Sequence, residues 1–214
     1  MRCLSAALLA CLLTTGCTEV GGAHAKAVYV LLDVSGSYNQ QLDAANPVIN
    51  YLLGTLNSGD SLTVAKIDSA SFTEKDVVSK ITFDDRPSVA NEQKRLVRER
   101  LDEFFKDRKP STRTDVSGAL MQAGEELDET NAGHRYILVF SDLEQDLPKG
   151  YVRKSKLPLA GAEVVAIDVA KLKSDNVNPQ NYVDRLAYWK KMVTEDGGKW
   201  QVVNDMDHLD RVID

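Results

Sequence analysis

The chain has 214 residues, of which 43% are hydrophobic and 27% charged, a balance that excludes intrinsic disorder and suits one globular domain of ordinary size. Its formal net charge is −6 and no basic block interrupts the sequence, so nucleic-acid binding is not expected. The three histidines are scattered, which argues against a histidine-rich zinc site.

The first 26 residues differ in character from the rest of the chain. One arginine is followed by an apolar run that ends at residue 13, which is too short to span a membrane but typical of a secretory signal. The run leads into the sequence TTGC at positions 14–17, which resembles the lipobox of bacterial lipoproteins. We therefore predict a signal peptide over 1–16, lipid attachment at Cys17 and a short polar tether over 17–26.

Cysteine usage agrees with this interpretation. All three cysteines lie at or before residue 17, so cleavage before Cys17 leaves only one, and no disulfide can form within the mature chain. Residue 18 is Thr rather than Asp, which by analogy with lipoproteins of diderm bacteria favours the outer membrane of the cell envelope, facing the periplasm. A plain secreted protein with an incidental cysteine is the alternative.

From residue 27 onward, predicted strands alternate with predicted helices. Continuous apolar runs indicate strands that are buried on both faces, whereas apolar residues three or four positions apart indicate helices. We expect strands over 27–32, 62–67, 77–83, 136–140, 163–169 and 199–203. We expect helices over 47–56 with Asn46 as its cap, over 88–107 and 116–127, from Asn178-Pro179 onward, and over 209–213.

This alternation predicts a doubly wound α/β fold over residues 27–214. Such a fold has a mostly parallel sheet, here of six strands, with helices on both faces. A short polar loop joins the second and third strands, so the third strand is expected to be antiparallel and to lie at an edge of the sheet.

The direction of the strands brings three distant polar segments together. If the first strand runs upward, Asp33 ends it at the top. The segment 109–115 and Asp142 then also lie at the top. Ligands of open α/β sheets bind at this edge, outside the carboxyl ends of the strands.

The three segments offer oxygen-bearing side chains, with neither thiol nor imidazole. The segment DVSGS provides Asp33, Ser35 and Ser37, the second segment provides Thr114, and the third provides Asp142. Carboxylate and hydroxyl oxygens suit small hard cations, with water completing the coordination sphere. The sequence therefore predicts a site for Mg²⁺ or Mn²⁺ that is formed by these five residues.

The same segments resemble the metal-ion-dependent adhesion site of von Willebrand factor type A domains. Asp33, Ser35 and Ser37 match the D-x-S-x-S signature of the family. Thr114 matches its threonine at a helix start, and Asp142 matches its aspartate after the fourth strand. The resemblance implies the same α/β fold for the whole mature domain.

The resemblance also implies how the site works. The three hydroxyls would contact the metal, and the two carboxylates would bind it directly or through water. An Asp or Glu from a partner protein would then complete the coordination sphere, without catalysis. Leu143 is a departure, because it stands where the family often has Gly, a residue that helps this loop to turn.

Simpler explanations exist for the individual residues. Asp33 and Asp142 could cap the turns that follow their strands, and Thr114 could be the N-cap of the next helix. The other nearby acids are expected to be solvated rim residues rather than to bind a metal; they are Asp68, Asp76, Glu144 and Asp146.

Two other functions compete with protein binding. An envelope scaffold or assembly factor that does not need its metal site would share the fold and the location. Phosphohydrolases of the haloacid dehalogenase type also begin with a strand that ends in Asp, but they need a second Asp where Ser35 stands. Because that proton donor is missing, we do not expect an enzyme.

Overall fold

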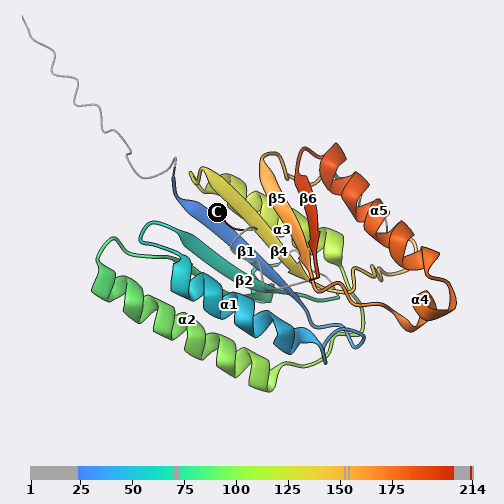
Figure 1. The fold of residues 1–214 in the computed structure, drawn as a ribbon, viewed down its shortest axis with the longest axis horizontal. Coiled ribbons are helices and arrows are strands. Elements are labelled where there is room, and N and C mark those ends of the chain that lie inside the picture. Colours follow the sequence, from blue (N-terminus) through green and yellow to red (C-terminus); the bar gives the residue numbers. More distant parts are fainter. Residues whose placement is uncertain (1–23, 70–72, 152, 154, 205–212, 214) are drawn as a thin grey trace, which may run out of the picture.

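The computed structural model describes residues 24–69, 73–151, 153, 155–204 and 213, and its centre is a six-stranded sheet (Figure 1). The strand order is β3-β2-β1-β4-β5-β6. Strands β2 and β3 are antiparallel and the other neighbouring pairs are parallel, which confirms the predicted sheet. The strands are β1 (Lys26–Asp33), β2 (Ser61–Ile67), β3 (Val77–Thr82), β4 (His134–Phe140), β5 (Ala162–Ile167) and β6 (Lys199–Val203).

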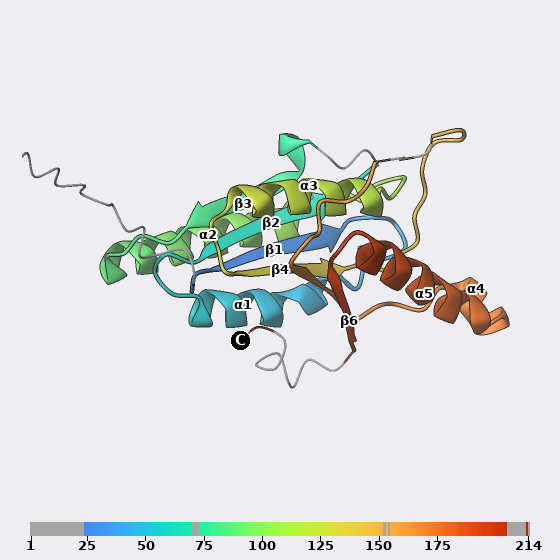
Figure 2. The same ribbon diagram turned by 90° about the horizontal axis from the view of Figure 1, so that it is seen from above.

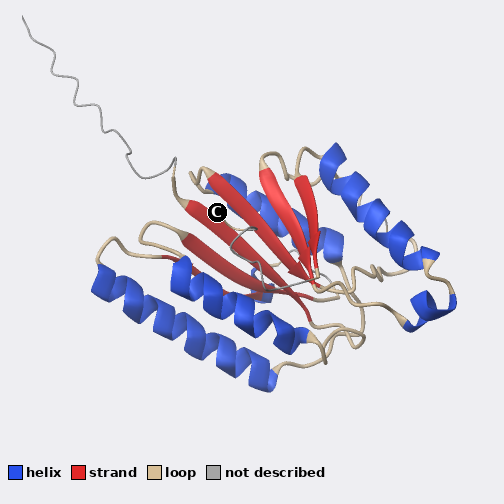
Figure 3. Cartoon of the chain, viewed as in Figure 1, coloured by secondary structure: helices blue, strands red, loops and turns tan. Residues whose placement is uncertain are grey.

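Helices cover both faces of the sheet (Figures 2 and 3). One face packs against α1 and α2, and the other packs against α3 and α5, while the short α4 precedes α5. The helices are α1 (Ala45–Thr55), α2 (Pro87–Asp107), α3 (Val116–Glu129), α4 (Lys173–Val177) and α5 (Gln180–Glu195).

The central strand β1 explains why its sequence is a continuous apolar run. Val28, Val30 and Leu32 pack in the cluster that includes α1 and α2, whereas Tyr29 and Leu31 pack in the cluster that includes α3 and α5. Successive side chains of a strand point to opposite faces, so both sets are buried. Burial of each such side chain contributes roughly 1.5–3 kcal/mol, and this holds the edge that carries the site in place.

The start of the first helix differs from the prediction. The helix begins at Ala45, and Asn46 is not its cap. A 3₁₀ turn over Leu42–Ala44 runs directly into the helix, so Pro47 lies within the first turn, where the N–H that proline lacks has no helical partner anyway. Asn46 instead donates its side-chain N–H to the backbone oxygen of Asp43 at 3.3 Å.

Some predictions fall on residues that the structure does not describe. Cys17 and the predicted signal peptide precede residue 24, and the helix expected over 209–213 falls on such residues apart from Ile213. Within the described ranges, no helix combines the length and the apolar character needed to cross a bilayer.

Candidate metal centre

Three loops meet at the carboxyl edge of the sheet. Loop 1 is residues 34–41, loop 2 is residues 108–115, and loop 3 is residues 141–147. Strands β1 and β4 are parallel neighbours, so loops 1 and 3 begin side by side. The long helix α2 returns the chain to the same edge before loop 2, as Figure 1 shows.

Backbone contacts join these loops to one another. The N–H of Ser111 donates to the oxygen of Val34 at 2.7 Å, which connects loop 2 to loop 1. The N–H of Asp146 donates to the oxygen of Thr114 at 2.9 Å, which connects loop 3 to loop 2. The structure therefore brings together the three segments that carry the predicted ligands.

Asp33 is completely buried at the end of β1. Its Oδ1 accepts a hydrogen bond from the N–H of Ser35 at 2.7 Å, and its Oδ2 accepts one from the hydroxyl of Ser141. Burial raises the pKa of Asp33 to about 6; the hydrogen bonds oppose this rise and the Asp142 carboxylate adds to it. Ionisation of Asp33 is thus less favourable here than in water, and a nearby positive charge would favour it.

Asp142 is buried as well, two residues past the end of β4. Its Oδ1 accepts a hydrogen bond from the N–H of Glu144 at 2.9 Å. Its Oδ2 is buried and has no hydrogen-bond partner among the described residues. Leaving such an acceptor unsatisfied costs about 1–3 kcal/mol, and more when it is charged, so this oxygen fits a site that receives a cation.

The hydroxyls of the predicted set differ in exposure. Ser35 and Thr114 are buried, whereas Ser37 is exposed, and the Ser35 and Ser37 oxygens lie 3.1 Å apart. Thr114 is not the N-cap of α3, because Asp115 has that position and its Oδ1 accepts from the N–H of Gly118 at 2.8 Å. The simpler explanation of Thr114 is therefore wrong.

Turn capping explains only some of the features of Asp33 and Asp142. One oxygen of Asp33 and one of Asp142 each accept the N–H two residues further on, as the simpler explanation expects. An exposed aspartate would be enough for that purpose. Capping does not explain why both carboxylates are buried beside each other with the second oxygen of Asp142 unpaired.

The donor set fits a small hard cation. It contains two carboxylates and three hydroxyls, which are the oxygen donors that Mg²⁺ and Mn²⁺ accept. Within the part of the chain that the structure describes, no three His, Cys, Asp or Glu side chains are grouped as metal ligands. A cation at this edge would therefore depend on the hydroxyls as well as on Asp33 and Asp142.

Sequence reasoning missed Ser141. Leu32 pairs with Phe140 in the sheet, so the next residues along each strand, Asp33 and Ser141, lie side by side. The hydroxyl of Ser141 donates to Asp33 and accepts from the N–H of Leu143 at 2.8 Å, which fixes both loops. The register between β1 and β4 would have indicated this contact, but it can be derived only once the two strands are known to be neighbours.

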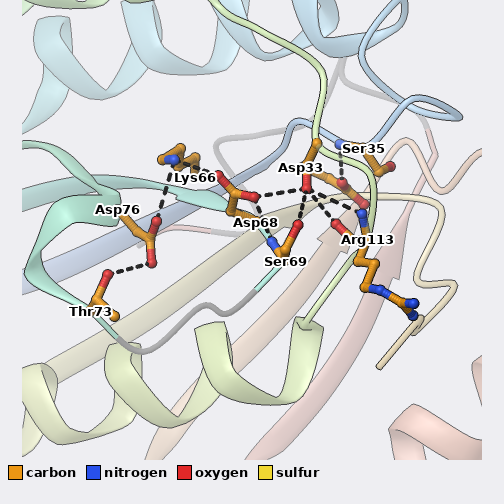
Figure 4. Close-up of polar contacts among 9 residues, drawn as sticks. Asp33, Ser35, Lys66, Asp68, Ser69, Thr73, Asp76 and Arg113 are labelled. Carbon is orange, nitrogen blue, oxygen red and sulfur yellow. Dashed lines mark hydrogen bonds and ion pairs between the residues drawn. The ribbon is translucent and has the colours of Figure 1, made fainter. Parts of the chain in front are cut away.

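A polar chain holds loop 2 from the side of β2 (Figure 4). Asp68 pairs with Lys66 at 2.5 Å and accepts from the hydroxyl of Ser111 at 2.8 Å. Lys66 also lies 3.4 Å from Asp76, which is buried and accepts from Thr73 at 3.0 Å. The prediction of a solvated acid is therefore wrong for Asp76, which is buried, whereas Asp68 is part-exposed; Lys66 pairs with both.

Helix α5 fixes loop 3 just after Asp142. Leu143 has a φ of 60°, in the left-handed region that favours glycine, so the bulkier residue adopts the turn at a cost of about 1–2 kcal/mol. The indole N–H of Trp189 donates to the oxygen of Leu143 at 2.9 Å. The guanidinium of Arg185 lies 3.7 Å from the Glu144 carboxylate. These two contacts hold the strained residue in place.

No protein-family model matches this sequence, and no curated protein is significantly similar to it. Solved structures are similar. A von Willebrand factor type A protein from Catenulispora acidiphila is 14% identical with a TM-score of 0.50, over 85% of this chain and 39% of that chain. An aerotolerance-related membrane protein from Bacteroides fragilis is 14% identical with a TM-score of 0.47, over 88% of this chain and 96% of that chain.

A third structure is the conserved hypothetical protein BatB from Bacteroides thetaiotaomicron. It is 16% identical with a TM-score of 0.47, over 88% of this chain and 94% of that chain. At such low identity, likeness concerns the fold alone. The sheet order and the likeness to the Catenulispora protein show that this chain has the von Willebrand factor type A fold, as its motifs predict.

Proposed function

We propose that loops 1–3 bind Mg²⁺ or Mn²⁺ and, through it, a carboxylate of a partner protein. The observation that carries the proposal is the buried Oδ2 of Asp142, which lacks a hydrogen-bond partner among the described residues and lies near the uncompensated charge of Asp33. The type of fold supports it, because open α/β sheets bind ligands at this edge.

Five side chains would hold the cation, and they divide into two kinds. Two carboxylates provide negative charge, and three hydroxyls are neutral, so the hydroxyls add ligands without cancelling the charge of the metal. When bound, the cation supplies a positive site that an Asp or Glu of a partner can occupy. The residues are Asp33, Ser35, Ser37, Thr114 and Asp142.

Calorimetric titration of the chain with Mn²⁺ and with Mg²⁺ tests the cation site. We expect binding that Asp142→Asn weakens by at least about tenfold, since even partners of metal ligands contribute this much. Asp146→Asn is the matched control, because this acid lies in the same loop but is exposed and pairs with Arg113 at 3.1 Å. An unmodified chain that binds neither cation would overturn the proposal.

Affinity capture from an envelope extract tests the partner. Capture in Mg²⁺ should recover a protein that is lost in EDTA and lost with Asp142→Asn, and the Asp146→Asn chain should recover it normally. A partner that binds equally well in EDTA and to Asp142→Asn would instead support the envelope scaffold whose metal site is not required.

We also propose that the chain is a lipoprotein of the cell envelope, anchored through Cys17 and facing the periplasm. The support is the sequence of the first 17 residues, in which an apolar run leads to TTGC. Cys17→Ser should move the protein from the outer-membrane fraction to the soluble periplasm. An unchanged distribution would contradict the anchor.

The proposed function includes no catalysis. Ser35 stands where a phosphohydrolase of the haloacid dehalogenase type needs its second aspartate, so proton transfer to a leaving group lacks a donor. A generic phosphate ester assayed with Mg²⁺ should give no turnover above background. Turnover that Asp33→Asn abolishes would show that the chain is an enzyme.

A further inference from the structure

A surface crevice is lined by residues of both loop 3 and α5, which meet close to the candidate metal centre. Its volume is about 430 Å³, within the range of ligand-binding clefts. Leu143, the residue after Asp142, is one of its lining residues, so the crevice adjoins loop 3 close to the candidate centre. We call it the loop 3–α5 crevice, and its main lining residues are Leu143, Glu144, Asp184, Arg185 and Tyr188.

Tyr188 provides an aromatic surface at this crevice. Tyr188 is 52% exposed, so one part of its ring is open to a partner. The ring packs edge-on against Trp189, with 5.3 Å between the ring centroids. Trp189 is buried, and its indole N–H donates a hydrogen bond to the oxygen of Leu143. The ring is therefore supported by the residue that fixes loop 3, so little freedom is lost when a partner packs on it.

The charges around the crevice are mostly negative. Arg185 is the cation that lines it, and Asp175 already occupies the guanidinium at 2.7 and 3.2 Å. Glu144 lies further from that guanidinium, at 3.7 Å, and its side chain is 57% exposed. Asp184 is exposed and accepts only a neutral amide hydrogen bond, from Gln180, among the contacts described for it.

An aromatic face beside exposed carboxylates is a favourable environment for a basic side chain. A cation over a tyrosine ring gains about 0.5–1 kcal/mol at an exposed site, and complementary charges add to affinity and specificity. We propose that the loop 3–α5 crevice receives an Arg or Lys of the same partner segment that offers its Asp or Glu to the metal centre. This inference rests on the proposed function and names the chemistry of the partner: a segment with one acidic and one basic residue.

A displayed library of random peptides provides a test that does not need the natural partner. The library is selected on the full chain in Mn²⁺, and bound peptides are eluted with EDTA. We expect the eluted peptides to contain an Asp or Glu together with an Arg or Lys at a preferred spacing. An enriched synthetic peptide then serves as the probe for affinity measurements on variants.

Variants in the crevice should affect the peptide and leave the cation unchanged. Tyr188→Ala is expected to weaken peptide binding about two- to fivefold, the fold-change that corresponds to the cation–π energy above, and Asp184→Asn should weaken it by a similar factor, both with unaltered Mn²⁺ affinity. Glu195→Gln is the matched control, because it is an exposed acid at the other end of the same helix. Equal peptide affinity for all three variants would overturn the inference.

The two proposals fail in different ways. EDTA-eluted peptides that share an acidic residue but no basic one would overturn the crevice inference and leave the metal-bridged function standing. Recovery of no EDTA-eluted peptide, together with no Mn²⁺ binding in the calorimeter, would overturn the proposed function and the crevice inference with it.

Discussion

Two regions near the top of the sheet bury carboxylates in opposite ways. Asp175, at the start of α4, has its side chain 1% exposed and is paired with Arg185 through both oxygens, and it also accepts the N–H of Leu172 at 2.8 Å. The hydrogen bond from Arg185 is the main reason that the pKa of Asp175 lies below its usual value. At the candidate metal centre, Asp33 and Asp142 are buried just as deeply, yet the pKa of Asp33 is raised.

The difference separates structural acids from acids that are available for binding. The chain neutralises Asp175 with an arginine of its own, and so completes that interaction internally. It gives Asp33 only hydroxyl and N–H donors, and it leaves one oxygen of Asp142 without a partner among the described residues. Four predictions test this contrast.

The largest effect is expected from removing the internal cation. Arg185→Met leaves Asp175 buried without its counter-charge, and breaking a buried pair in this way costs about 3–5 kcal/mol. Urea denaturation measures the loss of unfolding free energy. Lys191→Met is the control, since its exposed pair with Glu195 should contribute less than about 1 kcal/mol. A loss for Arg185→Met as small as the control would refute the structural role of the pair.

Cation binding should stabilise the fold by nearly as much. At Mn²⁺ concentrations a hundred times the dissociation constant, a ligand that binds only the folded state adds about 2.7 kcal/mol. Thermal unfolding with Mn²⁺ and with EDTA measures this increment. Asp142→Asn should lose it and Asp146→Asn should keep it. An increment that survives in Asp142→Asn would place the cation elsewhere.

Without cation, the two kinds of acid should respond oppositely to neutralisation. In EDTA, Asp142→Asn removes a buried charge that has one unpaired oxygen and that raises the pKa of Asp33, so stability should rise by about 1 kcal/mol. Asp175→Asn should instead reduce it, because Arg185 loses its counter-charge. Urea denaturation in EDTA measures the unfolding free energy of both variants. A loss of stability in Asp142→Asn would contradict the difference between the two kinds of acid.

The smallest effect concerns Asp68, which supports loop 2. Burial acts to raise its pKa, but the hydrogen bonds from Lys66, the N–H of Ser69 and Ser111 lower it to about 2, from a usual 3.8. Since the folded pKa lies below the unfolded one, the ionised form stabilises the fold above about pH 4, and this contribution is lost as pH falls towards 2. Acid unfolding of Asp68→Asn should be less steep over that range. An identical acid profile for wild type and variant would remove Asp68 from this role.

The sequence was sufficient to predict the fold and its strands, although the short α4 was not predicted. Apolar runs such as 27–32 are buried on both faces in any parallel sheet, and strand direction then places Asp33 and Asp142 at one edge. These inferences depend only on periodicity and on the short polar loop before β3. The structure adds which carboxylate oxygens of Asp33 and Asp142 have hydrogen-bond partners and which one has none among the described residues.

What the sequence could not supply were partners that are distant along the chain. Asp76 was expected in solvent, yet Lys66 pairs with it, and no periodicity connects the two. Asp115 rather than Thr114 caps α3, because adjacent residues compete for one position and only the backbone angles decide. The support of loop 3 by Trp189 spans 46 positions and is visible only in three dimensions.

The direction of β1 determines how the domain presents itself. The strand begins at Lys26 and ends at Asp33, eight residues that extend about 26 Å. The chain before Lys26 therefore joins the domain at the amino-terminal edge of β1, and loops 1–3 lie at the opposite, carboxyl edge (Figure 1). An anchor at the amino-terminal side would hold the domain with its binding edge pointing outward, so a partner could be reached at a distance from the membrane surface without passing beneath the protein.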